Sequence, residues 1–171
     1  MCGGAVIAKC GEIIAWHWAH DVSDCDTWSE GESEWHAEWK RRFPIEWQEV
    51  IVGNHRADVK TPKCVIELQR SSIDVASIAA RERHYGKIVW VVDASEFEDN
   101  VIFRDRGDYV SFRWKWPRKS WWQAKRQVYF DFDGELFQVR KVHDSVPCGG
   151  WGVWVDDETF MKRVGAFALS R

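Results

Sequence analysis

Two carboxylates and an amide lie close together in the stretch RADVKTPKCVIELQ, as Asp58, Glu67 and Gln69. Side chains alternate along a strand, so Glu67 and Gln69 share one face while the apolar Ile66 and Leu68 share the other. A buried carboxylate without a partner is costly, so this polar face needs a cation, an ion pair or solvent. Asp58 and Glu67, converging from neighbouring strands, suit a hard divalent cation such as Mg²⁺, which activates water and stabilises a phosphoryl transition state. An edge strand with a solvated polar face is the alternative interpretation.

A second group of polar residues lies upstream on a predicted helix. Glu32, His36 and Lys40 are spaced at i, i+4 and i+8, so they form one stripe of that helix. The stripe can add a metal or water contact through Glu32 or His36, and Glu34 competes with Glu32 for this role. An exposed face with favourable Glu-to-Lys spacing would give the same pattern.

A third group lies near the end of a second predicted helix. Arg81 and Tyr85 are one helical turn apart, so both can reach one phosphate, the arginine through its fork and the tyrosine through its hydroxyl. The alternative is an arginine that only favours the negative end of the helix dipole.

The elements that must position these groups can be predicted from apolar periodicity and turn residues. The first predicted helix is stopped by Pro44, and the second is capped by Ser72 and stopped by Gly86. The order is helix, three strands, helix, strand, with predicted bounds 31–43, 49–52, 56–59, 64–68, 72–86 and 88–93. Outside this α/β core we predict a short hairpin at 5–7 and 13–16, a strand at 109–116, a hairpin at 128–140 about Asp133-Gly134, a glycine-rich loop at 149–152, and a last helix or strand at 158–167.

Several short motifs follow one another in the chain and together carry a family resemblance. They are Glu32-Ser33-x-x-His36-x-x-x-Lys40, Arg56-Ala57-Asp58, Glu67-Leu68-Gln69-x-Ser71 and Arg81-x-x-x-Tyr85, preceded by His17-Trp18-Ala19-His20. This set, within roughly residues 5–93, resembles the competence protein CoiA-like nuclease family of the PD-(D/E)XK superfamily. The resemblance implies a restriction-endonuclease-like α/β fold with a core of order α-β-β-β-α-β and a C-terminal β-rich extension.

The resemblance also implies a function, which is metal-dependent hydrolysis of DNA phosphodiester bonds in DNA uptake, repair, mobile-element biology or defence. Asp58 and Glu67 would bind Mg²⁺ or Mn²⁺ with the backbone carbonyl of Leu68, and Glu32 with His36 would complete or extend the site. Lys40, Ser71, Arg81 and Tyr85 would contact the nucleic acid.

The chain departs from the superfamily pattern at Gln69, where lysine is usual. An amide can orient the attacking water, but it cannot supply positive charge or readily accept a proton. Some related nucleases use Glu-x-Gln, so the leading hypothesis is an active enzyme in which activation of the attacking water depends more on the metal than on residue 69. The alternative is a catalytically degenerate nucleic-acid-binding or regulatory module.

Composition bounds the remaining possibilities. The 171 residues include 45% hydrophobic side chains, which suits a single domain with a core at about 30–95, an N-terminal hairpin and loop at 1–29, and an extension at 96–171. Seven acids and no Lys or Arg lie within 21–38, whereas eight bases and two acids lie within 102–127. This asymmetry is compatible with a metal-binding end and a polyanion-binding end, or simply with two different solvated faces.

The cysteines and the absence of a long apolar run bear on the cellular setting. The five cysteines match no disulfide framework and no run could span a membrane, so we predict a reduced, cytoplasmic protein, for which a homodimer is conceivable. A zinc site from Cys2, Cys10, His17, His20 and Cys25 lacks a tight Cys-x-x-Cys knuckle, and ordinary thiols are therefore favoured.

The thirteen tryptophans divide into two groups. Trp35, Trp39 and Trp90 fit core positions. In the run 113–122, bases and aromatics interleave, as in surfaces that stack unpaired bases and follow phosphates. We favour a strand whose tryptophan side faces the core and whose basic side faces water, where it could still line a DNA track.

Overall fold

The computed structural model describes residues 6–9, 17–20, 28 and 31–166. Two short antiparallel strands, β1 (Val6–Lys9) and β2 (His17–His20), form a small separate sheet. The hairpin was predicted with its second strand at 13–16, which lies outside the described residues. The zinc hypothesis falls on Cys2, Cys10 and Cys25, which also lie outside them, as do the side chains of His17 and His20.

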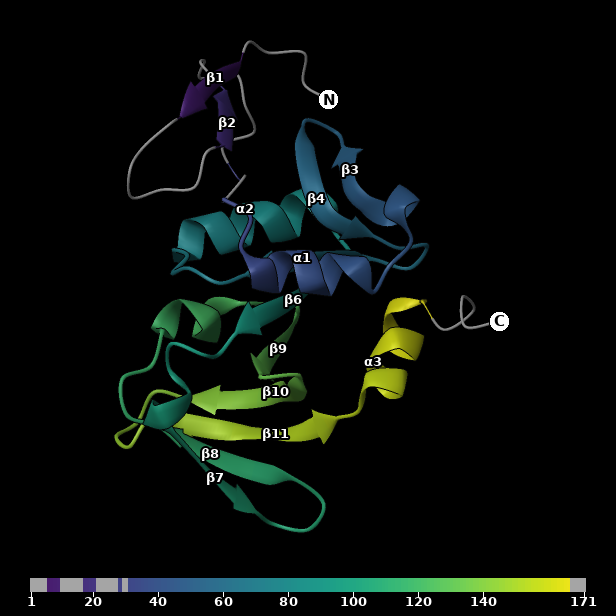
Figure 1. Cartoon of the computed structure of the whole chain (residues 1–171). Coiled ribbons are helices and arrows are strands. Elements are labelled where there is room, and N and C mark those ends of the chain that lie inside the picture. Colours follow the sequence, from purple (N-terminus) through teal and green to yellow (C-terminus); the bar gives the residue numbers. More distant parts are fainter. Residues whose placement is uncertain (1–5, 10–16, 21–27, 29–30, 167–171) are drawn as a thin grey trace.

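The body of the protein is one nine-stranded mixed sheet of order β3-β4-β5-β6-β9-β10-β11-β8-β7 (Figure 1). The three central strands β5, β6 and β9 are parallel to one another, and the remaining pairs are antiparallel. The strands are β3 (Gln48–Val52), β4 (His55–Lys60), β5 (Val65–Gln69), β6 (Ile88–Asp93), β7 (Val101–Asp105), β8 (Val110–Trp114), β9 (Gln127–Phe132), β10 (Glu135–His143) and β11 (Gly149–Val155).

Three α-helices are found among the described residues, namely α1 (Glu34–Arg41), α2 (Val75–Tyr85) and α3 (Asp157–Val164). Each begins after a polar side chain that accepts a backbone N–H of the first turn, from Ser33, Asp74 and Asp156 respectively. The second helix thus starts after Asp74 rather than at the predicted Ser72. Three short 3-10 helices connect other elements, at η1 (Ile45–Trp47), η2 (Glu98–Asn100) and η3 (Lys119–Gln123).

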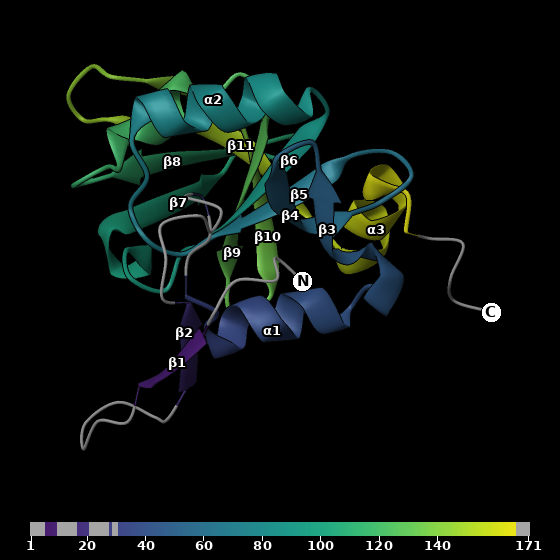
Figure 2. The ribbon, with the colours of Figure 1, turned by 90° about the horizontal axis from the view of Figure 1, so that it is seen from above.

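The two faces of the sheet are covered by different helices. On one face α2 packs through Ile78 against a cluster that includes Trp90 and Phe137. On the other face α1 and α3 pack through Trp39 and Phe160. Figure 2 shows α1 and α2 on opposite sides of the strands. Because β5, β6 and β9 are covered on both sides, their side chains are almost all buried, as expected for central parallel strands.

The predicted fold class is wrong. A restriction-endonuclease-like core of order α-β-β-β-α-β with flanking helices and an appended extension was expected, whereas the structure is a strand-dominated mixed sheet of nine strands with only three short α-helices in the described part. The expectation rested on local patterns within 31–93. Those patterns do not encode that β6 pairs with β9 rather than ending a separate core, and this pairing merges both parts into one sheet.

The glycine-rich segment predicted as a loop is also different, because it forms part of strand β11. The lack of side chains there reflects close backbone approach in the sheet. A Cβ on Gly149 would lie 2.1 Å from the Phe112 carbonyl oxygen, and one on Gly152 would lie 2.2 Å from the Gln138 carbonyl oxygen. The segment 158–167 was predicted to form either a helix or a strand, and most of it belongs to helix α3.

The tryptophan predictions can be compared directly with burial. Trp39 and Trp90 are buried, and Trp35 is half-buried against the core. In the interleaved run, Trp114 and Trp121 are buried while Arg113 is exposed, as predicted, but Trp116, beyond the end of β8, is 67% exposed and does not face the core. Among the described residues, no helix is both long and apolar enough to cross a membrane.

Candidate active site

One cavity of about 330 Å³ lies where α1, the β3–β4 hairpin, β5 and α2 meet. It brings together seven of the predicted site residues with three others. The lining residues are Trp28, Glu32, His36, Lys40, Glu49, Arg56, Asp58, Glu67, Leu68 and Arg81. Among these described lining residues, four side chains are carboxylates and three are Lys or Arg, so the acids outnumber the permanent cations by one.

Asp58 and Glu67 are delivered by neighbouring antiparallel strands, β4 and β5. An Oδ atom of Asp58 accepts the backbone N–H of Leu68 at 2.8 Å, which ties the two strands together beside the cavity. Burial raises the pKa of Asp58. Burial and the neighbouring Asp58 carboxylate raise the pKa of Glu67 to about 8, against the opposing effect of Arg81. The two carboxyls therefore hold a proton near neutral pH when no cation is present.

Arg81 compensates only one side of the Glu67 carboxylate. Its guanidinium donates to Glu67 Oε2 at 2.9 Å and to the Trp28 carbonyl at 3.0 Å, and both Arg81 and Glu67 are buried. The other carboxylate oxygen, Glu67 Oε1, is buried and has no hydrogen-bond donor within the described residues. A buried acceptor without a donor is expensive, so this oxygen is available to a cation.

His36 positions the backbone of β5. One ring nitrogen lies 3.1 Å from the Leu68 carbonyl oxygen, and the other lies 2.8 Å from Ser33 Oγ. Since a carbonyl can only accept, Nε2 carries a proton and donates it to Leu68, while Nδ1 is hydrogen-bonded to the Ser33 hydroxyl. His36 thus fixes the Leu68 carbonyl, which has a second lone pair available.

Lys40 lies at the centre of an ion-pair chain along the cavity wall. Its ammonium contacts Glu32 at 2.7 Å and Glu49 at 2.5 Å, and Glu49 also pairs with Arg56 at 2.7 Å. Burial alone would lower the pKa of Lys40, but the two glutamates outweigh it, and the net effect is a raised pKa. Glu49 has φ of +53°, a left-handed conformation that is uncommon for a non-glycine residue.

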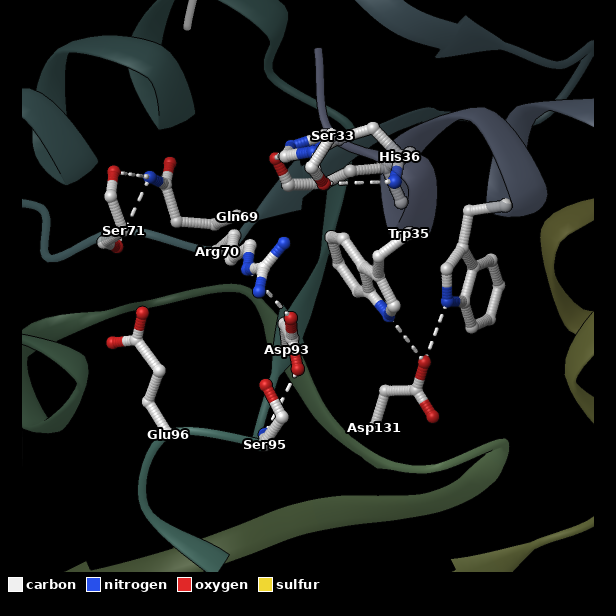
Figure 3. A network of polar contacts seen from close by, with 12 residues as sticks. Ser33, Trp35, His36, Gln69, Arg70, Ser71, Asp93, Ser95, Glu96 and Asp131 are labelled. Carbon is white, nitrogen blue, oxygen red and sulfur yellow. Dashed lines mark hydrogen bonds and ion pairs between the residues drawn. The ribbon is translucent and has the colours of Figure 1, made fainter. Parts of the chain in front are cut away.

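Helix α1 is held in place by a carboxylate on β9, the middle strand of the sheet (Figure 3). The indole nitrogens of Trp35 and Trp39 donate to one carboxylate oxygen of Asp131 on β9, at 2.8 and 2.6 Å. Asp131 is buried, and its other oxygen accepts from the Gly134 backbone at 2.7 Å. These bonds fix the helix face that presents His36 and Lys40 to the cavity.

Three predicted residues do not line the cavity. Gln69 is fully buried, and its amide donates to the Ser71 carbonyl at 3.2 Å and to Ser71 Oγ at 3.3 Å (Figure 3). Ser71 lines a neighbouring depression of about 410 Å³ with His36 and Arg70. Tyr85 packs edge-on against Trp28, with ring centroids 5.9 Å apart.

Three lining residues were not predicted as site residues. Arg56 stands two residues before Asp58 on β4, and this alternation could have identified it as a candidate. Glu49 reaches the cavity through a left-handed backbone conformation, and Trp28 reaches it through its carbonyl bond to Arg81. Neither has a local sequence signal.

The donor set can be compared with the needs of a metal ion. The described residues contain no group of three or more His, Cys, Asp or Glu side chains arranged to hold a metal. Mg²⁺ needs only one or two carboxylates and keeps several waters. Asp58, the unpartnered oxygen of Glu67 and the Leu68 carbonyl fit that requirement. Comparisons with models of known protein families, with curated proteins and with solved structures find no match to this chain.

Proposed function

We propose that this protein is a Mg²⁺- or Mn²⁺-dependent nuclease that hydrolyses DNA phosphodiester bonds. The observation that carries the proposal is the pair of converging carboxylates, Asp58 and Glu67, in a solvent-connected cavity with one buried oxygen lacking a donor among the described residues. Burial raises the pKa of both carboxyls, and the Asp58 carboxylate adds to the rise at Glu67, so the ionised pair is costly without a cation. A divalent cation would lower this cost.

Each residue of the cavity then has a definable task. Asp58, Glu67 and the Leu68 carbonyl would hold the cation, which when bound would activate water and stabilise charge on the phosphoryl group. His36 fixes the orientation of the carbonyl, and Arg81 keeps Glu67 oriented by a buried ion pair. Such support from behind the ligands is what holds a metal site in shape.

The remaining predicted roles become more specific in this setting. Lys40 offers a positive charge on the cavity wall to an entering phosphate, although Glu32 and Glu49 already share this charge. Gln69 is outside the cavity and engaged by Ser71, so we assign it to holding the end of β5 rather than to proton transfer. A resemblance to CoiA-like nucleases remains a proposal based on the motifs.

A nucleic-acid-binding module without catalysis is the second candidate. It is favoured by the Arg81–Glu67 ion pair, which already neutralises one of the two carboxylates. Under this proposal the cavity would be a structural charge network, and no metal would bind there.

Cleavage and metal binding should be measured separately on the full chain. Plasmid and linear DNA are incubated with Mg²⁺, Mn²⁺ or EDTA, and Mn²⁺ binding is followed by electron paramagnetic resonance. We expect metal-dependent cleavage that falls at least roughly a hundredfold in Asp58→Asn and Glu67→Gln, with weakened Mn²⁺ binding. Glu98→Gln, an exposed acid on η2, is the matched control and should change neither.

Two outcomes would contradict the nuclease proposal. Cleavage that persists in both carboxamide variants would place the chemistry elsewhere. DNA binding without cleavage under either metal would favour the second candidate. Thermal melting of every variant shows whether a loss reflects unfolding.

A further inference from the structure

The last four strands of the sheet present an unusual outward face, far from the cavity. In antiparallel strands, residues directly opposite one another project on the same side. One row runs across β10, β11, β8 and β7 as Lys141, Trp151, Ser111 and Arg104. The next row runs as His143, Gly149, Arg113 and Ile102. The opposite side of these strands carries the buried Phe112, Trp114 and Phe137.

The cations of this face are not neutralised by the protein. Arg104, Arg113 and Lys141 are exposed, and Arg106 folds back from the β7–β8 turn to donate to Ser111 Oγ at 3.2 Å. Within the described part of the chain, none of these four side chains forms an ion pair with a carboxylate. The acids nearby are at the rim, where Asp105 ends β7 and Asp108 lies in the turn that follows. Asp144 is paired with Lys119 at 2.9 Å.

Aromatic side chains lie among these cations. Trp151 remains 38% exposed in the middle of its row, and Tyr109, at 41%, packs edge-on against it with ring centroids 5.7 Å apart. An exposed tryptophan held in place by a second ring offers a flat surface for another planar group. We call Arg104, Arg106, Arg113, Lys141, His143, Tyr109 and Trp151 the basic aromatic face.

The face is also hollowed where a side chain is missing. Gly149 stands between His143 and Arg113 in the second row, and a Cβ there would clash with the Phe112 backbone. A depression of about 310 Å³ lies beside it, lined by residues that include Arg104, Arg113 and His143. No carboxylate is among the lining residues that the structure describes.

We propose that the basic aromatic face binds single-stranded nucleic acid, with phosphates along the arginines and an unpaired base stacked on Trp151. Four uncompensated cations are complementary to a phosphate backbone, and stacking on an exposed indole requires a base that is not paired in a duplex. The inference rests on the proposed function only in naming nucleic acid as the ligand, because binding here does not require hydrolysis.

A second basic surface offers a contrast. A depression of about 520 Å³ lies at the N-terminal ends of β5, β6 and β9. Its described lining residues include six Lys or Arg side chains and neither an acid nor an aromatic residue; the six are Lys63, Lys87, Lys125, Arg126, Arg140 and Arg163. It could attract phosphates but could not stack bases, so it serves as the internal control for charge alone.

The test measures binding of fluorescent deoxythymidine and uridine oligonucleotides to the full chain by anisotropy in EDTA, where metal-dependent cleavage cannot occur. We expect Trp151→Ala to weaken binding roughly tenfold or more. Arg113→Glu should weaken it comparably and reduce the salt dependence, since each lost phosphate contact lowers the slope by about 0.7 for single strands. A duplex of the same length should bind more weakly than either strand.

The controls match residue type and exposure. Trp154 is on the same strand, 41% exposed, and contacts Phe103 and Phe137 on the other side of the sheet, so Trp154→Phe should leave binding unchanged. Lys87→Glu reverses a charge in the second depression and should have a smaller effect than Arg113→Glu.

Three results would overturn the proposal. These are unchanged affinity in both Trp151→Ala and Arg113→Glu, a larger loss in Lys87→Glu than in Arg113→Glu, or tighter binding of the duplex. Because all measurements are made in EDTA, failure of the nuclease proposal would appear as absent cleavage with these affinities intact. Failure of the present proposal would leave the metal-dependent cleavage intact.

Discussion

The cavity and the basic aromatic face contain similar residue types in opposite physical settings. In the cavity, Lys40 and Arg81 are buried, and each is paired with at least one glutamate. On the face, Arg104, Arg113 and Lys141 are exposed, and none is paired with a carboxylate in the described part of the chain. Buried pairs hold geometry because breaking them leaves an uncompensated charge, whereas exposed unpaired cations are free to meet a ligand. The comparison therefore distinguishes the cavity, where hydrolysis is proposed, from the basic aromatic face, where binding of single-stranded nucleic acid is proposed.

The strongest test of this separation is a crossed pair of variants. Glu67→Gln should lower metal-dependent cleavage at least roughly a hundredfold, because several kcal/mol of transition-state stabilisation would be lost. The same variant should bind single-stranded nucleic acid in EDTA as the wild type does. Trp151→Ala should weaken binding of single-stranded nucleic acid but preserve cleavage at saturating DNA. Cleavage rates and anisotropy on the same preparations measure both effects. Loss of both properties in both variants would show that the two regions do not act separately.

The pH dependence should also differ between the regions. Glu67 has a pKa of about 8 in the folded protein, so below that pH its proton must leave when a divalent cation binds. Affinity for Mg²⁺ should therefore rise about tenfold per pH unit from about pH 6 and level off above about pH 8. Isothermal titration calorimetry in buffers of different ionisation enthalpy measures the released proton. Binding of single-stranded nucleic acid in EDTA should change far less with pH, because the Arg and Lys side chains of the basic aromatic face remain charged throughout this range. A flat Mg²⁺ affinity would exclude Glu67 as a ligand.

Salt should weaken nucleic-acid binding by the basic aromatic face and should have little effect on the ion pairs of the cavity. If four cations contact phosphates of a single strand, affinity should fall about fiftyfold between 50 and 200 mM salt, from a slope of about −0.7 per contact. The ion pairs of the cavity are partly buried and are screened much less. The melting temperature without DNA should accordingly move little over the same range. An affinity that does not depend on salt would contradict the proposed contacts between the four cations and the phosphates.

Stability offers a matched comparison of two lysines. Lys40→Met leaves Glu32 and Glu49 without their shared cation and should lower the free energy of unfolding by about 2 kcal/mol, less than for a fully buried pair because both glutamates are partly exposed. Lys141→Met removes an exposed lysine that has no ion-pair partner in the described part and should change it by less than about 0.5 kcal/mol. Urea denaturation of both variants measures the difference. Equal effects would mean that the Lys40 network contributes nothing to stability.

The smallest expected effect concerns the pH dependence of stability without metal. The folded-state pKa of Glu67 is raised from an ordinary 4.5 to about 8, so between these values the folded protein holds a proton that the unfolded chain has released. Stability should therefore fall as pH rises through this window. Asp58→Asn removes the neighbouring charge and should reduce that fall, which would raise the melting temperature at pH 8 by about 2–4 °C relative to the wild type. Equal stability at pH 5 and pH 8 would contradict the raised pKa of Glu67, and an unchanged melting temperature in Asp58→Asn at pH 8 would argue against repulsion between the two carboxyls.

Much of the cavity could be predicted from sequence because its residues follow local periodicities. Strand alternation predicted that the side chains of Glu67 and Leu68 point to opposite faces of β5. Helical spacing predicted that His36 and Lys40 lie on one stripe of α1. The partners of these residues could not be predicted in this way. Arg81 was expected to meet a phosphate, and its ion pair with Glu67, with both side chains buried between α2 and β5, was not predicted.

The fold class failed for a related reason. The pairing of β6 with β9 joins segments that no periodicity connects, and the outward rows of the basic aromatic face depend on the register of four strands. The interleaved run at 113–122 indicated that one side of a strand would be basic. It could not indicate that Arg104, Lys141 and Trp151 would join Arg113 on the same surface.

The bonds from Trp35 and Trp39 to Asp131 have a consequence for the timing of synthesis. Asp131 follows the two tryptophans by 96 and 92 residues. A ribosome making this chain releases α1, β4 and β5 well before the acceptor for those indoles exists. The nascent chain therefore carries the cavity residues without the anchor that orients them, and the site can be completed only once β9 has emerged and joined the sheet.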